Sequence, residues 1–101
     1  MLNKFCNLIG ILPEGHTHIF KSVLEAIKNA DLNLAAFHLM TGLNAHNTRE
    51  LQPYDIYRWL VGIYYLKNDT KKALKYAMLA RSISTKNVKL EFLYQKLLTS
   101  N

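Results

Sequence analysis

Hydrophobic residues recur at helical intervals along the whole chain, and no stretch alternates between apolar and polar residues as a β-strand would. Pro13-Glu14-Gly15 interrupts this pattern and ends a short first segment, residues 2–12. A second helix is expected from about residue 16 to the tight turn at 29–31, where Asp31 can cap the third helix. The chain is therefore predicted to be all-α.

The second half continues with the same period after a polar loop at 44–50. Pro53 fits the first turn of a fourth helix, where its missing N–H costs nothing. Asn68 tolerates a left-handed backbone at the end of that helix, and Asp69 can cap the fifth, which should run to about Ser84. A sixth helix is expected up to residue 98. The short turns predict antiparallel helix hairpins in one domain, 1–101, with about six helices.

A repeat of about 34 residues accounts for much of this pattern. Residues 54–87 resemble a tetratricopeptide repeat at Tyr57, Leu60, Val61, Tyr64, Asn68, Asp69, Ala73, Ala77 and Ala80. Residues 16–43 resemble it in a more degenerate form at Ile19, Val23, Ala26, Ala30, Asp31, Ala35 and Leu39. The segment 88–98 would be an unpaired terminal helix. The resemblance implies a short right-handed solenoid, and an ordinary six-helix bundle is the alternative.

Three segments also resemble the small tetratricopeptide-like chaperones of type III secretion needle subunits. They are Asn29 to Ala36, Leu60 to Ser82 and Val88 to Leu98. The resemblance implies the larger member of a bacterial chaperone pair. With a small helical co-chaperone, such a protein keeps the needle subunit from polymerising in the cytoplasm before export. The amphipathic C-terminal helix of the subunit would lie in the concave groove.

In a tetratricopeptide stack the first helix of each pair lines that groove. The resemblance assigns to it Phe20, Leu24, Ile27, Arg58, Trp59, Gly62, Tyr65, Leu66, Phe92, Leu93 and Lys96. Trp59 and Tyr65 are the expected hot spots, because large rigid aromatic side chains dominate interface energetics. The alternative is that these residues are core. A one-residue shift of the first repeat would place Lys21, Glu25 and Lys28 in the groove instead.

The charge of the chain is distributed unevenly between its two halves. The net charge is +6, and basic and acidic residues balance within residues 1–50, so the whole excess lies in 51–101. Lys67, Lys71 and Lys75 recur every four residues and would form a basic ridge on one helix face. A small nucleic-acid-binding or regulatory protein is therefore the alternative function. A solvated surface, or a face for an acidic partner, would use the same residues.

The sequence contains no residue pattern typical of a catalytic or metal site. The single cysteine, Cys6, has no disulfide partner, and His16 and His18 are spaced to point to different helix faces. His38 and His46 have no neighbour at ligand spacing, so neither a metal site nor a cofactor is expected. With no nucleophile–base pair or phosphate loop, we expect a binding protein rather than an enzyme. No apolar run is long enough to cross a bilayer, no secretory signal is recognisable, and a cytoplasmic location is expected.

Overall fold

The computed structural model describes residues 4–5, 8, 18–44 and 53–99. Within them the chain forms five helices and no strand: α2 His18–Lys28, α3 Leu32–Asn44, α4 Pro53–Leu66, α5 Thr70–Ile83 and α6 Val88–Thr99. The prediction of an all-α chain is confirmed, with five helices rather than about six. Of the expected helix at 2–12, Lys4, Phe5 and Leu8 are helical, and the rest lies outside the described residues, as does most of the loop at 44–50.

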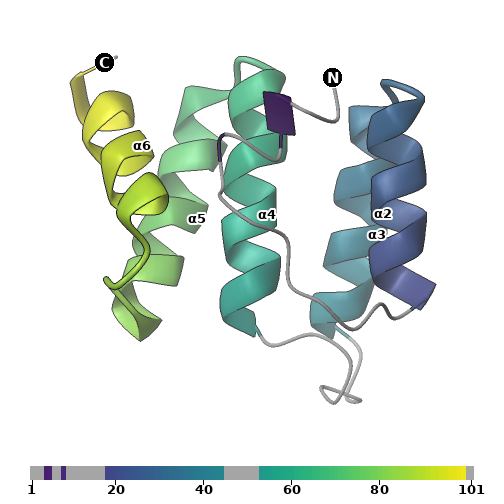
Figure 1. Cartoon of the computed structure of the whole chain (residues 1–101), viewed down its shortest axis with the longest axis horizontal. Helices are drawn as coiled ribbons and strands as arrows, with labels where there is room; N and C mark the ends of the chain where they lie inside the picture. The colour runs from purple at the N-terminus through teal and green to yellow at the C-terminus, as the bar shows by residue number, and fades with distance from the viewer. Residues whose placement is uncertain (1–3, 6–7, 9–17, 45–52, 100–101) are drawn as a thin grey trace.

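The helices are arranged in the order of the sequence. Figure 1 shows the α2/α3 pair at one end of the molecule, α6 at the other end, and α4 and α5 between them. The main helix–helix contacts join α2 to α3, α3 to α4, α4 to α5 and α5 to α6. Two antiparallel hairpins therefore stand side by side, and α6 packs against the second helix of the second hairpin.

Both hairpins turn in the same way, as the positions of Asp31 and Asp69 predicted. The residues before these aspartates, Ala30 and Asn68, have left-handed backbones with φ of 58° and 63°. In each turn the aspartate N–H reaches back five residues, from Asp31 to the Ala26 carbonyl (2.8 Å) and from Asp69 to the Tyr64 carbonyl (2.9 Å). Each pattern closes the preceding helix as a Schellman motif.

The same aspartates start the next helix. Asp31 Oδ1 accepts from the Leu34 N–H at 3.1 Å, and Asp69 Oδ1 accepts from the Lys72 N–H at 3.2 Å. Each contact satisfies one of the backbone donors that a helix N-terminus leaves unpaired. Helix end and helix start are thus joined in a few residues, and this forces each pair of helices to run antiparallel.

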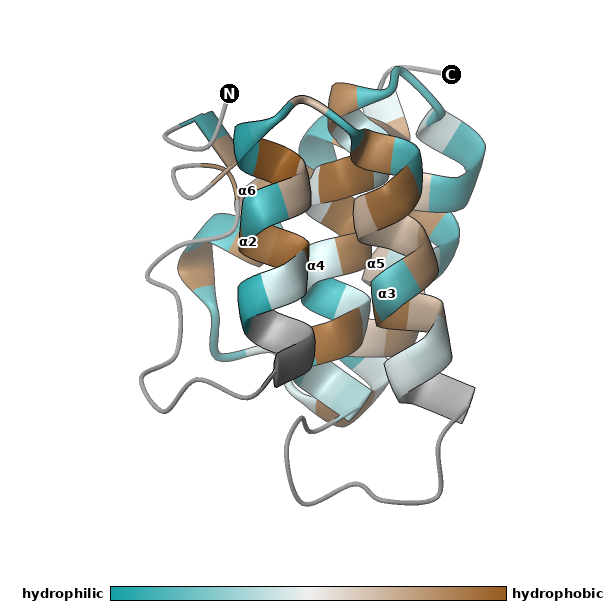
Figure 2. Ribbon diagram, turned by 90° about the vertical axis from the view of Figure 1, so that its right-hand side faces the viewer, coloured by the Kyte–Doolittle hydropathy of each residue, from teal (hydrophilic) through white to brown (hydrophobic). Residues whose placement is uncertain are grey.

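Small residues bring the helices together. Ala35 in α3 and Ala73, Ala77 and Ala80 in α5 are fully buried. Helix α4 is buried on several sides, and its core side chains are Ile56, Trp59, Leu60, Val61, Ile63 and Tyr64. Figure 2 shows hydrophobic residues concentrated towards the middle of the molecule in that view. Helix α4 is therefore the centre of the core.

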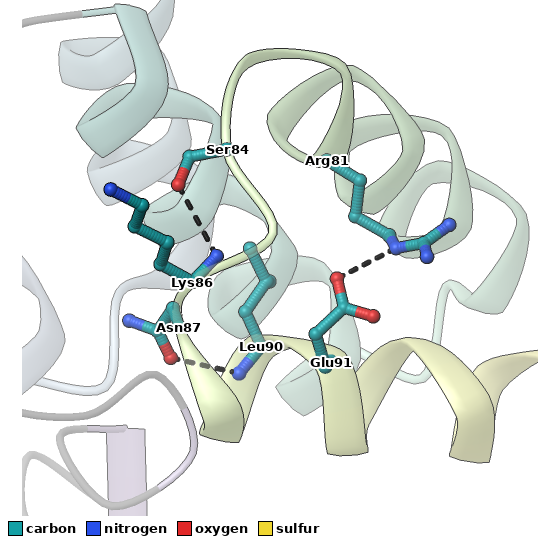
Figure 3. A network of polar contacts seen from close by, with 6 residues as sticks. All are labelled: Arg81, Ser84, Lys86, Asn87, Leu90 and Glu91. Carbon is teal, nitrogen blue, oxygen red and sulfur yellow. Dashed lines mark hydrogen bonds and ion pairs between the residues drawn. The ribbon is translucent and has the colours of Figure 1, made fainter.

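Helix α6 is held on α5 by the polar contacts of Figure 3. Arg81 Nε donates to Glu91 Oε1 at 2.7 Å, and the Arg81 guanidinium lies 4.1 Å from the Tyr94 ring centroid. Before the helix, Asn87 Oδ1 accepts from the Leu90 N–H at 3.0 Å and so caps α6. The Arg81–Glu91 pair thus links α5 to α6, beside the buried Leu90, Leu93 and Leu97 of α6.

Candidate functional site

The residues assigned to the groove fall into two groups in the structure. Ile27 and Trp59 are fully buried, Leu93 is 2 % exposed, and Gly62 is also buried. These four belong to the core, which was the alternative interpretation of the sequence. Of the four, only Leu93 also lines a surface depression, which is described below.

The second group is accessible. Phe92 is 69 % exposed and Lys96 is exposed, both on α6, while Leu24, Tyr65 and Leu66 are half-buried. Phe20 lies in α2, but its side chain lies outside the described residues. Apart from Leu24 on α2, the accessible part of the predicted groove is on α6 and α4.

Trp59 is covered by a residue that the sequence did not connect to it. The fully buried Phe5 ring lies edge-on to the indole, with 5.9 Å between ring centroids and an interplanar angle of 82°. Figure 1 shows the short dark purple piece near the N-terminus beside α4. An edge-to-face aromatic pair adds to the burial of both rings. The chain itself thus fills the part of the groove in which Trp59 was the expected hot spot.

The Arg58 side chain is also too buried to line an open groove. Its side chain is 9 % exposed and its Nη2 lies 3.5 Å from Asp55 Oδ1 in the preceding turn. The guanidinium lies 5.8 Å from the centroid of the Tyr54 ring. Burial raises the pKa of the Tyr54 hydroxyl, and the Arg58 charge opposes this shift. Arg58 is therefore tied to its own helix.

An apolar depression of about 380 Å³ lies along α6. Its lining consists of Leu8, Val88, Lys89, Phe92, Leu93 and Lys96. Val88 is 80 % exposed, so two large apolar side chains of α6 point into solvent four residues apart. Such i, i+4 pairs form a continuous ridge on a helix surface. Exposed apolar side chains gathered in one patch are typical of interaction surfaces.

Lys96 joins this depression to α4. Its Nζ lies 6.0 Å from the Phe92 ring centroid and 5.9 Å from the Tyr65 ring centroid. Tyr65 was the second expected hot spot, and the structure brings it to the same cation as Phe92. The combination of two aromatic rings and an ammonium group can hold an apolar helix face together with a carboxylate.

The lysine repeat of the sequence does not form one uniform ridge. Lys67 donates a hydrogen bond to Asn33 and lies 5.4 Å from the Tyr64 ring centroid, and Lys72 lies 5.3 Å from the same centroid. Lys75 lies 5.6 Å from the Tyr76 ring centroid. Lys67 and Lys75 of the predicted ridge thus lie beside tyrosine rings. Lys72, which was not part of the predicted ridge, also lies beside one.

Those tyrosines form a stack between α4 and α5 that the sequence analysis missed. The rings of Tyr57 and Tyr76 are 6.1 Å apart, and those of Tyr76 and Tyr64 are 5.7 Å apart with an interplanar angle of 8°. Burial raises the pKa of the Tyr64 and Tyr76 hydroxyls. Tyr57 and Tyr64 stand seven residues apart in α4 and at two positions of the predicted repeat, and these signals could have indicated the stack.

The described residues contain no group of three or more His, Cys, Asp or Glu side chains that could hold a metal ion. None of the helices that the structure describes is both long and apolar enough to cross a membrane.

Comparison of the chain with models of protein families, with curated proteins and with solved structures gives no match.

Proposed function

We propose that this chain is a tetratricopeptide-like chaperone that binds an amphipathic helix of another protein along α6 and the adjoining edge of α4. The observation that carries the proposal is the depression bounded by Val88, Phe92 and Lys96. An amphipathic helix would place apolar anchors on the two exposed side chains, at the i, i+3, i+4, i+7 spacing of helix-in-groove recognition.

The two identical hairpin turns support the repeat part of the proposal. Tetratricopeptide units are antiparallel helix pairs, and the Ala30-Asp31 and Asn68-Asp69 turns build such pairs with one hydrogen-bond pattern. The edge position of α6 fits the role of a terminal helix that lacks a second helix to pair with. In this proposal the chain acts as a binding protein and not as an enzyme.

The resemblance of residues 29–36, 60–82 and 88–98 to needle-subunit chaperones suggests which helix is bound. In the proposed complex it is the C-terminal helix of a type III secretion needle subunit, held in the bacterial cytoplasm together with a small helical co-chaperone. The bound helix lies beside Leu8 rather than on Trp59, because Leu8 lines the depression and Phe5 packs against the indole. This assignment moves the contact from the middle of the stack to its end.

The test is purification of the tagged chain from its native host, followed by mass spectrometry and determination of the mass of the complex. We expect a needle-sized subunit and a small helical protein in a one-to-one-to-one assembly. Phe92→Asp should lose the subunit. Phe37→Asp is the matched control, since Phe37 is similarly exposed (63 %) but lies on α3.

Three outcomes would count against the proposal. They are recovery of the chain alone, equal loss of the subunit in both variants, and recovery of nucleic acid that salt removes. The last would favour the nucleic-acid alternative, whose binding weakens steeply with salt. The tyrosine stack does not help that alternative, because Tyr64 and Tyr76 are only 8 % exposed and stack on each other.

A further inference from the structure

Helix α5 carries a second apolar surface, distinct from the α6 depression. It is a shallow hollow of about 550 Å³ lined by Lys71, Leu74, Lys75, Met78 and Leu79, and we call it the α5 face. Met78 is 55 % exposed and Leu79 is 37 % exposed. All five residues come from one helix, at spacings of three, four, seven and eight, so they form one stripe. No residue of the α6 depression belongs to it.

The charge of the α5 face has one sign. Lys71 and Lys75 are exposed, and among the described residues neither lies within ion-pair distance of a carboxylate. The nearby acidic groups are engaged elsewhere: Asp69 caps α5 and Glu91 pairs with Arg81. The face therefore presents apolar side chains flanked by two ammonium groups one helical turn apart.

We propose that the α5 face is a docking site for an acidic amphipathic helix of a second protein. Leu74 and Met78 form one i, i+4 row, and Lys71 and Lys75 form the row beside it. Rows of this kind interdigitate with the rows of a partner helix. A partner with apolar side chains facing the first row and carboxylates at i, i+4 facing the second complements the face in shape and charge.

Two other occupants fit less well. A second copy of this chain carries the same lysines and a net charge of +6, so a symmetric pairing of two α5 faces would bring like charges together. Single-stranded nucleic acid needs exposed rings for base stacking, and the α5 face has none among its lining residues. An acidic helix uses both the apolar and the charged row.

This proposal does not depend on the function proposed for α6. The two surfaces lie on different helices, so variants of one leave the other intact. Loss of helix binding at α6 would not affect the α5 face, and the reverse also holds.

Nuclear magnetic resonance of methionine methyl groups can report on the face directly. The chain has three methionines, and Met78 lies on the α5 face, whereas Met40 is half-buried and its Sδ accepts from the Tyr76 hydroxyl at 3.5 Å. The probe is a synthetic helical peptide of about five turns, with leucines at i, i+3, i+4 and i+7 and a glutamate pair at i, i+4 beside them. Titration should shift the Met78 methyl signal to saturation and leave Met40 nearly unmoved.

Charge exchange makes the test specific. Lys71→Glu/Lys75→Glu should weaken binding about fivefold to thirtyfold, because two charge pairs are lost. The same variant should bind the peptide in which the glutamates are lysines. The variant should fold, since acidic residues in the first turns of a helix suit its dipole. Lys28→Glu/Lys86→Glu changes the net charge equally at two exposed positions away from the face and should bind like the natural chain.

The proposal is overturned if the peptide leaves Met78 unmoved, or if both double variants weaken binding equally. It is also overturned if the lysine peptide fails to bind the charge-reversed variant. A Met78 signal that responds to phosphatidylserine vesicles and not to the peptide would assign the face to an anionic membrane instead.

Discussion

Helices α4 and α6 were predicted to line the same groove, but in the structure their aromatic side chains differ in exposure. Each contributes a large aromatic side chain to the prediction, Trp59 from α4 and Phe92 from α6. Trp59 is fully buried, and Phe92 is 69 % exposed. Helix α4 packs against α3 on one side and α5 on the other, and the Phe5 ring packs against Trp59. Helix α6 packs mainly against α5.

The difference shows that two aromatic residues assigned to the same groove have different surroundings. Trp59 is enclosed by the core and stabilises the fold. Phe92 keeps an open face, which is the face we propose for binding a helix of another protein. Four experiments test this contrast.

Trp59→Ala should cause the largest loss of stability. Removing a fully buried tryptophan lowers the free energy of unfolding by about 3–5 kcal/mol, because it leaves a cavity as well as losing apolar burial. Urea unfolding followed by far-ultraviolet circular dichroism measures the change. A loss below about 1 kcal/mol would mean that Trp59 lies at a surface and that α4 resembles α6.

Phe5→Ala should have the next largest effect. The expected loss is about 3 kcal/mol, the lower end of the range for removing a fully buried aromatic side chain, because phenylalanine is smaller than tryptophan. Trp59 is the single tryptophan, so its fluorescence emission should also move to longer wavelength as water reaches the indole. Lys4→Ala is the control, because Lys4 is the exposed neighbour of Phe5. An unchanged emission spectrum would show that Phe5 does not cover the indole.

High pH should weaken the contact between α4 and α5, which contains the buried Tyr64 and Tyr76. The folded-state pKa values of Tyr64 and Tyr76 are raised by burial above the ordinary value of 10.0. The folded protein therefore holds these protons more tightly, and the stability they contribute is present below pH 10 and falls as the pH rises above it. Unfolding at pH 8 to 11 should show a shallower decline in Tyr64→Phe/Tyr76→Phe. Identical curves would exclude the tyrosine stack as the cause.

Phe92→Ser should have the smallest effect on stability. An exposed side chain away from the core changes the free energy of unfolding by within about 0.5 kcal/mol. The same urea experiment measures it beside Trp59→Ala. A loss comparable to that of Trp59→Ala would show that Phe92 belongs to the core, and the contrast between the two helices would then disappear.

Much of the fold could be predicted because its signals are local. The aspartates at 31 and 69, the proline at 53 and the helical period define turns and starts within a few residues, and the observed helix bounds follow them closely. The left-handed Asn68 was expected from its side chain. Ala30 adopts the same conformation without such a preference, because the Schellman hydrogen bonds and the Asp31 cap determine the turn.

The candidate site could be predicted only in part, since exposure depends on contacts distant in the sequence. Helix α4 is apolar on most of its faces, so its periodicity does not indicate which face remains open. The contact between Phe5 and Trp59 joins residues far apart in the chain and has no local signal. The terminal position of α6 was predicted from the repeat, and that helix does carry the exposed Phe92 and Lys96.

The low contact order of this helical arrangement affects the rate at which the chain folds. Because most contacts join helices that follow one another, folding requires little long loop closure, and such helical chains fold in times on the order of microseconds to milliseconds. Each turn carries its own Schellman bonds and aspartate cap, so either hairpin can nucleate the structure. Helix α6, with a neighbour on one side, should be the last to dock and the first to detach.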